Sequence, residues 1–289
     1  MSYVIEAKGL SHCYPDGTSR QVYAVKNIDF SVEKGELVGI IGHTGSGKST
    51  LISHFNGLLK PTSGQILVDG EDIWKDKETL RHSRFKVGLC FQYPEYQLFE
   101  ETVFKDIAFG PKNMKLSDSE IKERVLRAAE YAGIKKELLD KSPFDLSGGE
   151  KRRAAIAGVM AMEPEVIIFD EPAAGLDPKG RKDLIKLIRD YRDRTGSAII
   201  IVSHSMEDMA SLADRIAVMN CGEIAMQGTV DEIYSQGEKL RSIGLNVPEI
   251  TEIFASLRAN GIDVPSNVYT IEQGSEILEK LMGGVHHDR

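Results

Sequence analysis

The sequence predicts an α/β fold with a parallel β-sheet at its centre. Two short apolar runs, residues 165–170 and 197–203, are separated by an amphipathic helix pattern that begins after Pro178. Strand, helix and parallel strand in this order form a unit whose crossover is right-handed. A further apolar strand, residues 36–41, precedes a glycine-rich loop and a segment suited to a helix over 48–58. Strand, glycine loop and helix are the setting that a phosphate-binding loop requires.

Length and charge set limits on the function. A chain of 289 residues with 41% hydrophobic content is long enough for a substantial core. Its net charge of −8 gives no overall basic field for nucleic acid or an anionic bilayer. The longest apolar runs fall far below the roughly 20 residues that span a membrane. The N-terminus lacks a signal-peptide pattern. The three cysteines, Cys13, Cys90 and Cys221, are odd in number and lack metal-site spacing, so a reducing cytoplasm is favoured.

Three further segments complete the predicted architecture. Residues 1–33 alternate apolar and polar positions around a Pro15-Asp16-Gly17 turn, which predicts antiparallel strands covering one side of the core. Residues from about 93 to 163 are rich in charge and helix formers, with a helix start at 117–120, and predict an inserted helical subdomain. Beyond about residue 236 the pattern weakens into an extension, 237–289, with short helical stretches around 248–259 and 270–282.

The glycine-rich loop matches the pattern G-x-x-x-x-G-K-[ST]. Its glycines let the backbone curl so that N–H groups point inward, while Lys48 neutralises the β and γ oxygens of a nucleotide and the Ser49 hydroxyl reaches Mg²⁺. A chance glycine-rich turn is the alternative, but both flanks and every required residue are present. The loop consists of Gly42, His43, Thr44, Gly45, Ser46, Gly47, Lys48, Ser49 and Thr50.

Polar residues end three of the predicted strands. Asp170 and Glu171 follow the buried run 166–169, where open α/β sheets bind ligands. We expect Asp170 to hold Mg²⁺ and Glu171 to orient or deprotonate the attacking water. A surface turn before a proline is the alternative, and it fits poorly with two acids directly after a buried strand. Gln92 and His204 end strands predicted to flank Asp170, so both should converge on the γ-phosphate.

A second phosphate-seeking element is the stretch Leu146-Ser147-Gly148-Gly149-Glu150. An exposed Ser-Gly-Gly loop opening a helix offers free backbone N–H groups and the positive end of the helix dipole. Because the chain already has its own phosphate loop, this second element suggests a site that two subunits share.

In this order and spacing, the phosphate loop, Gln92, the Ser147 loop, Asp170-Glu171, residues 175–178 and His204 resemble the ATP-binding-cassette ATPases. The resemblance covers residues 1 to about 236 and implies ATP and Mg²⁺ as cofactors. It implies that residues 146–150 form a signature loop, and that ATP lies between the phosphate loop of one subunit and the signature loop of the other in a head-to-tail dimer. The resemblance also implies roles for single residues. Tyr14 stacks on adenine, unless it serves sheet packing, Gln92 contacts Mg²⁺ and transmits its state to a partner, and His204 contacts the γ-phosphate. Asp177 couples the two sites, and four residues act across the interface: Ser147, Gly148, Gly149 and Glu150.

A narrower resemblance comes from the stretches 93–103, 106–111 and 152–159, together with Gly-His-Thr-Gly in the phosphate loop. They are similar to the ATPases of energy-coupling factor transporters, most of all to the second (A-prime) ATPase subunit of group-II modules. The resemblance implies peripheral attachment at the cytoplasmic face of the cell membrane, heterodimerisation with a second ATPase in which the extension takes part, and ATP-driven uptake of vitamins or other micronutrients. A transmembrane T-component would dock in a groove lined by Tyr93, Tyr96, Leu98 and Phe99, and S-components would be engaged indirectly. The alternative is that these residues only pack the joint between the core and the helical subdomain.

The sequence differs from the broad family in two places, and three functions are alternatives to that of an energy-coupling factor ATPase. His43 and Thr44 replace the commoner Pro-Asn, which favours the subgroup. Glu150 replaces the usual glutamine and adds negative charge beside the partner's nucleotide, so we expect a less active composite site. The alternatives are an ATPase of another ABC transporter, a soluble cassette ATPase acting on nucleic acid or ribosomes, and a regulatory subunit without hydrolysis. The acidic net charge disfavours nucleic-acid contact, and the intact phosphate loop and strand-end acids disfavour the regulatory role.

Overall fold

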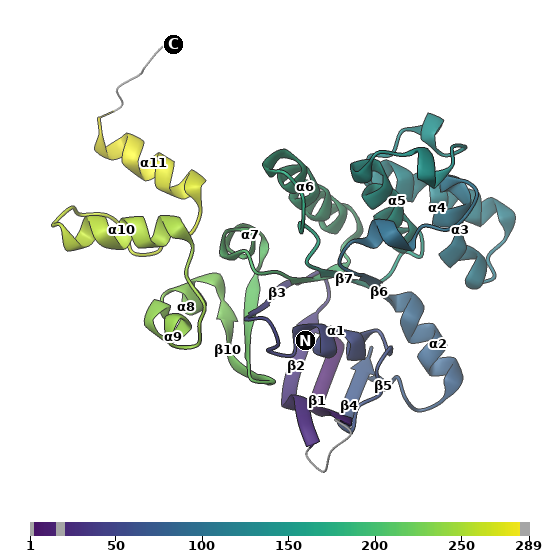
Figure 1. Cartoon of the computed structure of the whole chain (residues 1–289), viewed down its shortest axis with the longest axis horizontal. Coiled ribbons are helices and arrows are strands. Elements are labelled where there is room, and N and C mark those ends of the chain that lie inside the picture. The colour runs from purple at the N-terminus through teal and green to yellow at the C-terminus, as the bar shows by residue number, and fades with distance from the viewer. Residues whose placement is uncertain (1–2, 16–20, 284–289) are drawn as a thin grey trace.

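The computed structural model describes residues 3–15 and 21–283, which form two β-sheets and a set of helices (Figure 1). Most of the predicted Pro15-Asp16-Gly17 turn lies outside these described residues. The larger sheet has six strands in the order β10-β9-β3-β8-β7-β6. All its pairings are parallel except that of β10 with β9. The strands are β3 (Leu37–Gly42), β6 (Val87–Cys90), β7 (Val166–Asp170), β8 (Ala198–Val202), β9 (Arg215–Asn220) and β10 (Glu223–Thr229).

The strand order brings the predicted functional ends together. β7 is joined to its parallel neighbour β8 through helix α6 (Pro178–Thr195), as predicted. β7 lies between β6 and β8, which confirms that the strands leading to Gln92 and His204 flank the strand that ends at Asp170. Because carboxyl ends of parallel strands meet at one edge, these residues and the loop after β3 share one edge of the sheet.

The second sheet confirms the antiparallel strands predicted for the N-terminal segment. Its order is β2-β1-β4-β5, and β1 pairs with β2 and β4 in antiparallel register. Together with helix α1 (Lys48–Phe55) this sheet buries one face of the central sheet, where Val38, Ile40, Ile168 and Phe55 share a cluster. The remaining elements here are β1 (Tyr3–Pro15), β2 (Gln21–Glu33), β4 (Ser63–Val68), β5 (Glu71–Asp72) and α2 (Lys77–Lys86).

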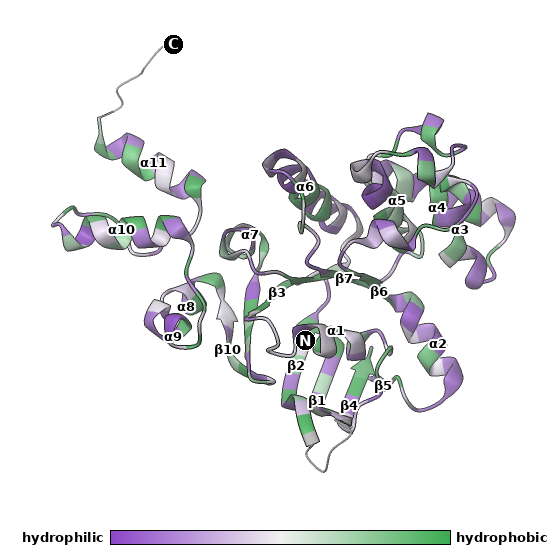
Figure 2. Cartoon of the chain, in the orientation of Figure 1, coloured by the Kyte–Doolittle hydropathy of each residue, from purple (hydrophilic) through white to green (hydrophobic). Residues whose placement is uncertain are grey.

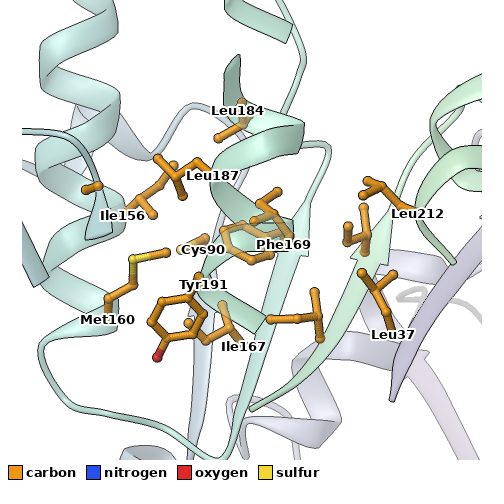
Figure 3. Close-up of a cluster of buried hydrophobic side chains, with 14 of the residues drawn as sticks. Leu37, Cys90, Ile156, Met160, Ile167, Phe169, Leu184, Leu187, Tyr191 and Leu212 are labelled. Atoms are coloured by element: carbon orange, nitrogen blue, oxygen red, sulfur yellow. The ribbon is translucent and has the colours of Figure 1, made fainter. Parts of the chain in front are cut away.

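The opposite face of the central sheet packs against α5 (Gly148–Met160), α6 and α7 (Met206–Leu212). Ile167 and Phe169 of β7 point to this face and contact a cluster that includes Leu187 and Tyr191 of α6 (Figure 3). Their neighbour Ile168 belongs to the other cluster, because successive side chains of a strand alternate. Burial on both faces explains why the central strands read as continuous apolar runs, which are strongly hydrophobic in Figure 2.

Only helices occur among the regular elements between β6 and β7, and they gather at one end of the molecule (Figure 1). The predicted helix start is confirmed, because Ser117 and Glu120 form a reciprocal capping box at the beginning of α4. α3 packs against both α4 and α5. The elements are η1 (Pro94–Gln97), α3 (Val103–Asn113), α4 (Asp118–Tyr131), η2 (Lys136–Leu138), η3 (Pro143–Asp145) and α5 (Gly148–Met160).

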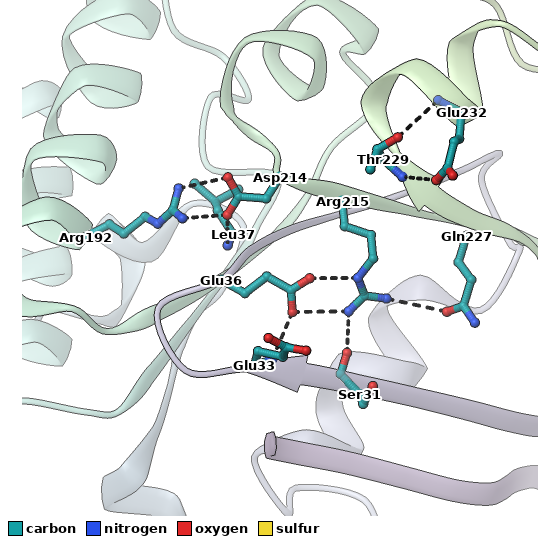
Figure 4. A network of polar contacts seen from close by, with 10 residues as sticks. All are labelled: Ser31, Glu33, Glu36, Leu37, Arg192, Asp214, Arg215, Gln227, Thr229 and Glu232. Atoms are coloured by element: carbon teal, nitrogen blue, oxygen red, sulfur yellow. Dashed lines mark hydrogen bonds and ion pairs between the residues drawn. The ribbon is translucent and has the colours of Figure 1, made fainter. Parts of the chain in front are cut away.

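Charged side chains fix the amino end of β3, opposite the phosphate loop (Figure 4). Arg215 of β9 donates to both carboxylate oxygens of Glu36, at 2.7 and 3.3 Å, and to the Ser31 carbonyl of β2. Asp214 accepts from the Leu37 backbone at 2.9 Å. The side chains of Glu36 and Arg215 are only 15% and 22% exposed, so this pair joins the two sheets largely away from water.

The C-terminal extension forms short helices docked beside α7. The predicted helical stretches appear as α10 (Glu249–Ala259) and α11 (Ile271–Leu281), after α8 (Val230–Tyr234) and α9 (Gly237–Ser242). Phe254 of α10 is fully buried in a small cluster of its own with Val264 and Val268. Tyr234 donates to the Met206 carbonyl at 3.0 Å, which ties α8 to α7. Within the described ranges, no helix has the length and apolar character needed to cross a membrane.

Candidate nucleotide-binding and hydrolysis site

The phosphate loop is held in its curled form by close packing against β2. Gly47 has a φ of +103°, and a Cβ there would lie 2.2 Å from the Ala24 carbonyl oxygen. Gly45 has a φ of +81° with open space around it, so its backbone conformation alone favours glycine. Gly45 and Gly47 therefore both serve the loop geometry predicted from the sequence.

Lys48 occupies the inside of this loop. Its ammonium group donates to the carbonyls of Gly42 and His43 at 2.7 and 3.0 Å. Burial lowers the pKa of Lys48, while the nearby carboxylates of Glu171 and Asp170 oppose that shift. A phosphate would supply this cation with the anionic acceptor that the carbonyls replace only in part.

Ser46 adds an unsatisfied hydroxyl group to the loop. The residue is fully buried, and its hydroxyl has no hydrogen-bond partner among the residues that the structure describes. An unpaired buried hydroxyl is costly, and an added phosphate oxygen would relieve that cost. The loop thus fits a nucleotide phosphate by its own chemistry.

Asn220, which is not among the predicted site residues, also contacts the phosphate loop. The His43 ring hydrogen-bonds the Thr44 carbonyl at 2.8 Å and the Asn220 side chain at 3.1 Å. Asn220 ends β9, the direct neighbour of β3. A polar residue at the carboxyl end of a sheet strand is the signal that identified His204, and it applies equally to Asn220.

Asp170 and Ser49 offer the oxygen donors that Mg²⁺ prefers. Burial raises the pKa of Asp170, and a hydrogen bond from the Ser49 hydroxyl together with the charge of Lys48 opposes that rise. A hydroxyl and a carboxylate already in contact fit a magnesium ion bound to nucleotide phosphates. Gln92 is exposed after β6, and its side chain forms no hydrogen bond with another described residue.

Glu171 and His204 meet at the same edge of the sheet. Glu171 has a left-handed backbone, φ +48°, and its N–H donates to the Val202 carbonyl at 2.9 Å. Burial raises the pKa of Glu171, against hydrogen bonding from the His204 backbone and the charge of Lys48. Burial also lowers the pKa of His204. A carboxylate with a raised pKa is a stronger proton acceptor, as a general base requires.

Tyr14 lies beside the phosphate-loop helix and is partly exposed. Its hydroxyl is 3.5 Å from the Thr50 hydroxyl, and its ring packs edge-on against His12 with centroids 4.5 Å apart. With 43% of the residue exposed, a surface of Tyr14 is left uncovered next to the phosphate loop. Sheet packing and a role at a nucleotide base are compatible in this arrangement.

The signature loop is built like an ordinary helix start. Ser147 and Glu150 form a capping box at α5, in which the Ser147 hydroxyl donates to the Glu150 carboxylate at 2.6 Å. These hydrogen bonds hold the pKa of Glu150 below its usual value. A Cβ on Gly148 or Gly149 would meet nothing within 4 Å. The chain's own fold therefore has no packing need for glycine at either position.

No hydrogen bond or ion pair among the described residues joins 147–150 to the phosphate loop. Asp177 is exposed and caps α6 by accepting from the Gly180 backbone at 2.7 Å. The signature residues and Asp177 are thus presented at the surface rather than gathered with Lys48, Asp170 and Glu171.

Three of the four predicted groove residues are exposed. The exposed fractions of Tyr96, Phe99 and Tyr93 are 85%, 59% and 39%. Leu98 is half-buried against the main core cluster. Packing of the joint therefore accounts for Leu98 but leaves the aromatic rings largely available to another molecule.

Three features define a nucleoside-triphosphate hydrolase of the cassette type. They are the phosphate loop after β3, the two acids at the end of β7, and the exposed signature loop. Residues 25–174 match the ABC transporter family, to which the chain belongs. The predicted fold class is confirmed by this match and by the solved structures that resemble the chain.

Curated relatives extend the similarity to nearly the whole chain. The "Energy-coupling factor transporter ATP-binding protein EcfA2" of Caldanaerobacter subterraneus is 53% identical, covering 97% of this chain and 98% of the relative. The protein of the same name from Clostridium perfringens is 52% identical over 96% and 98%. These relatives confirm the predicted resemblance to the ATPases of energy-coupling factor transporters.

Among solved structures, cbiO1 from Clostridium perfringens, described as part of the ABC transporter complex cbiONQ, matches with a TM-score of 0.75. The two are 38% identical, and the match covers 88% of this chain and all of cbiO1. The ATP-binding cassette MJ0796, solved as a dimer bound to ADP and Pi, matches with a TM-score of 0.70 and 27% identity over 78% of this chain and 98% of MJ0796.

Proposed function

We propose that this chain is an ATP-hydrolysing subunit of an energy-coupling factor importer, attached peripherally at the cytoplasmic face of the membrane. One observation supports the role as an ATPase whose site is shared between two subunits. The chain has a phosphate loop of its own, and it also displays two signature glycines, Gly148 and Gly149, at which an added Cβ would meet nothing in the chain's own fold. Such glycines fit a site where the nucleotide of another subunit approaches the backbone closely.

The residues divide the work of hydrolysis between them. Lys48, Ser46 and the loop N–H groups bind the phosphates, and the Tyr14 ring takes the adenine. Ser49, Asp170 and Gln92 hold Mg²⁺, which would neutralise charge on the phosphate oxygens. Glu171 accepts a proton from the attacking water, and His204 contacts the γ-phosphate from the neighbouring strand end.

A second, homologous ATPase completes each site in a head-to-tail heterodimer. Ser147, Gly148, Gly149 and Glu150 face the nucleotide of that partner, and Asp177 lies near the interface. ATP favours the closed pair because it contacts both subunits there, and hydrolysis removes that preference. The extension, residues 237–289, contributes to the contact between the ATPases.

A transmembrane T-component is the second partner. The exposed rings of Tyr93, Tyr96 and Phe99, next to Leu98, supply an apolar surface for one of its helices. S-components that bind vitamins or other micronutrients are engaged through the T-component. Nucleic acid is not expected as a partner, because the net charge is −8.

Purification of the tagged full-length chain from detergent-solubilised membranes tests this proposal. A second ATPase and a transmembrane subunit are expected in the complex, with ATP hydrolysis that depends on Glu171. Ribosomes or DNA in place of those subunits would point to a soluble cassette ATPase instead.

A further inference from the structure

Arg152 connects three segments that the chain keeps far apart in sequence. It lies on α5, directly after the signature loop, and its residue is 5% exposed. Its guanidinium donates to both carboxylate oxygens of Glu95, at 2.8 and 3.0 Å, across 57 residues. A bidentate pair of this kind has a fixed geometry that lysine does not reproduce.

The other arm of the guanidinium reaches the turn after the proposed general base. Arg152 Nη1 donates to the carbonyls of Pro172 and Ala174 at 3.1 and 2.9 Å. This turn leaves Glu171, which is held in a left-handed conformation, and leads to Asp177. The backbone that carries both residues is therefore anchored by a side chain from the signature helix.

Tyr93 makes a second connection in the same place. Its ring lies 5.8 Å from the Arg152 guanidinium carbon, and a Cβ on Gly175 would be 3.5 Å from Tyr93 Cε1. Tyr93 has a φ of +56°, which is uncommon for an aromatic residue and persists only where surrounding contacts impose it. The Tyr93 ring therefore lies beside the turn 172–175, and the Glu95–Arg152 pair links the segment 93–96 to the same turn.

From this arrangement we infer that the Glu95–Arg152 pair is a positioning device, which ties the turn carrying Glu171 and Asp177 to the segment 93–96, where the rings of Tyr93 and Tyr96 are exposed. A displacement of that segment moves Glu95, and the Arg152 guanidinium moves with it because Glu95 binds one of its edges. The carbonyls of Pro172 and Ala174 then move as well, because they accept hydrogen bonds from Nη1. Glu95 and Arg152 touch no reacting group, so they act through the placement of Glu171. The inference rests on the proposed function in two places, the T-component as the molecule that moves the segment and Glu171 as the general base.

The pair has a matched control at the opposite edge of the sheet. Arg215 also binds a glutamate, Glu36, through two contacts and donates to a backbone carbonyl. The side chains of Glu36 and Glu95 are about equally exposed, 15% and 16%, while Arg215 is 22% exposed and Arg152 is 6% exposed. Arg215 contacts neither the exposed segment nor the turn. Glu36→Gln therefore reproduces the loss of a buried ion pair without disturbing the proposed link.

The first test is amide hydrogen exchange in the full-length chain without membrane components. In Glu95→Gln and in Arg152→Met, the amides of residues 173–177 should exchange about tenfold faster than in the unaltered chain, while Glu36→Gln leaves them unchanged. The double variant should exchange no faster than the single ones, because either change already breaks the link. Unchanged exchange in Glu95→Gln, or equal acceleration in Glu36→Gln, would overturn the inference.

The second test measures hydrolysis by the ATPase pair and by the complete membrane complex. Glu95→Gln should lower kcat about tenfold with an unchanged KM for ATP, because a displaced catalytic group slows the reaction while the phosphate loop stays intact. The increase in kcat on assembly with the membrane component should be lost as well. A raised KM with unchanged kcat would contradict the positioning role. Failure of the unaltered chain to form a membrane complex would count against the proposed function, and the exchange experiment would still decide on the link.

Discussion

His204 Nε2 lies 3.2 Å from Glu171 Oε1, yet this carboxylate oxygen is buried and has no aligned hydrogen bond within the described part of the chain. The two side chains come from the ends of neighbouring strands, β8 and β7. Burial raises the pKa of Glu171 and lowers that of His204, so both shifts weaken a charged pair between them. The contact with His204 therefore does not neutralise the Glu171 carboxylate, which keeps its capacity to accept a proton.

Glu171→Gln is expected to reduce ATP turnover about 100-fold or more, because an amide keeps the size of the side chain but cannot accept the proton. ATP binding should persist, since the phosphate loop is intact, and the ATP-bound closed dimer should accumulate. Single-turnover hydrolysis and size-exclusion chromatography with ATP measure the two effects. Glu272→Gln on the exposed side of α11 is the control, and undiminished turnover in Glu171→Gln would remove Glu171 from the role of base.

The pH dependence of turnover follows from the same carboxylate. Glu171 must be ionised to act, and burial raises its pKa above the ordinary value of 4.5. Activity should therefore fall with decreasing pH at a midpoint above 4.5 in a profile of kcat for the assembled ATPase. The raised folded-state pKa values of Glu171 and Asp170 mean that their protonation favours the folded state. Circular dichroism over the same range should show the fold intact while kcat falls, and a midpoint at or below 4.5 would contradict this account.

Apolar runs and the residues that end them predicted most of this site. The strands before Asp170 and His204 are buried on both faces, so their patterns in the sequence were unambiguous. Local patterns could not reveal contacts between distant polar residues. Glu95 and Arg152 are charged, and charged residues in helical surroundings usually face solvent. Their burial depends on finding each other and two backbone carbonyls, which only the folded chain determines. Asn220 and the short strands β4 and β5 escaped prediction for the related reason that tertiary pairing defines them.

Alanine at two glycines should separate the needs of the fold from those of the partner. Gly47→Ala places a Cβ 2.2 Å from the Ala24 carbonyl at a φ of +103°, so it should destabilise the chain by about 2 kcal/mol or more. Gly148→Ala meets open space at the start of a helix, so stability should be unchanged or rise by up to about 1 kcal/mol. The second variant should nevertheless lower ATP hydrolysis by the ATPase pair. Urea unfolding and turnover measured on the same samples distinguish the two, and full activity of Gly148→Ala would argue against a shared site.

Glu150 is expected to reduce the activity of the composite site that uses the partner's phosphate loop. Its lowered pKa keeps the carboxylate ionised next to the signature loop, where it would repel the ATP of a partner subunit. Glu150→Gln should raise hydrolysis at that site by about two- to fivefold, the size expected of a partly screened charge. In a Lys48→Ala background this chain's own phosphate loop is silent, so the remaining rate reports that site alone.

The chain supplies a close control for this experiment. Ser117 and Glu120 form the same capping box at α4, with a Ser117 hydroxyl to Glu120 distance of 2.6 Å that equals the one at Glu150. Glu120→Gln therefore removes an equivalent capping charge away from the signature loop and should leave the rate unchanged. A similar rate change in both variants would indicate an effect of helix capping, and no change in either would show that Glu150 does not make the two composite sites unequal.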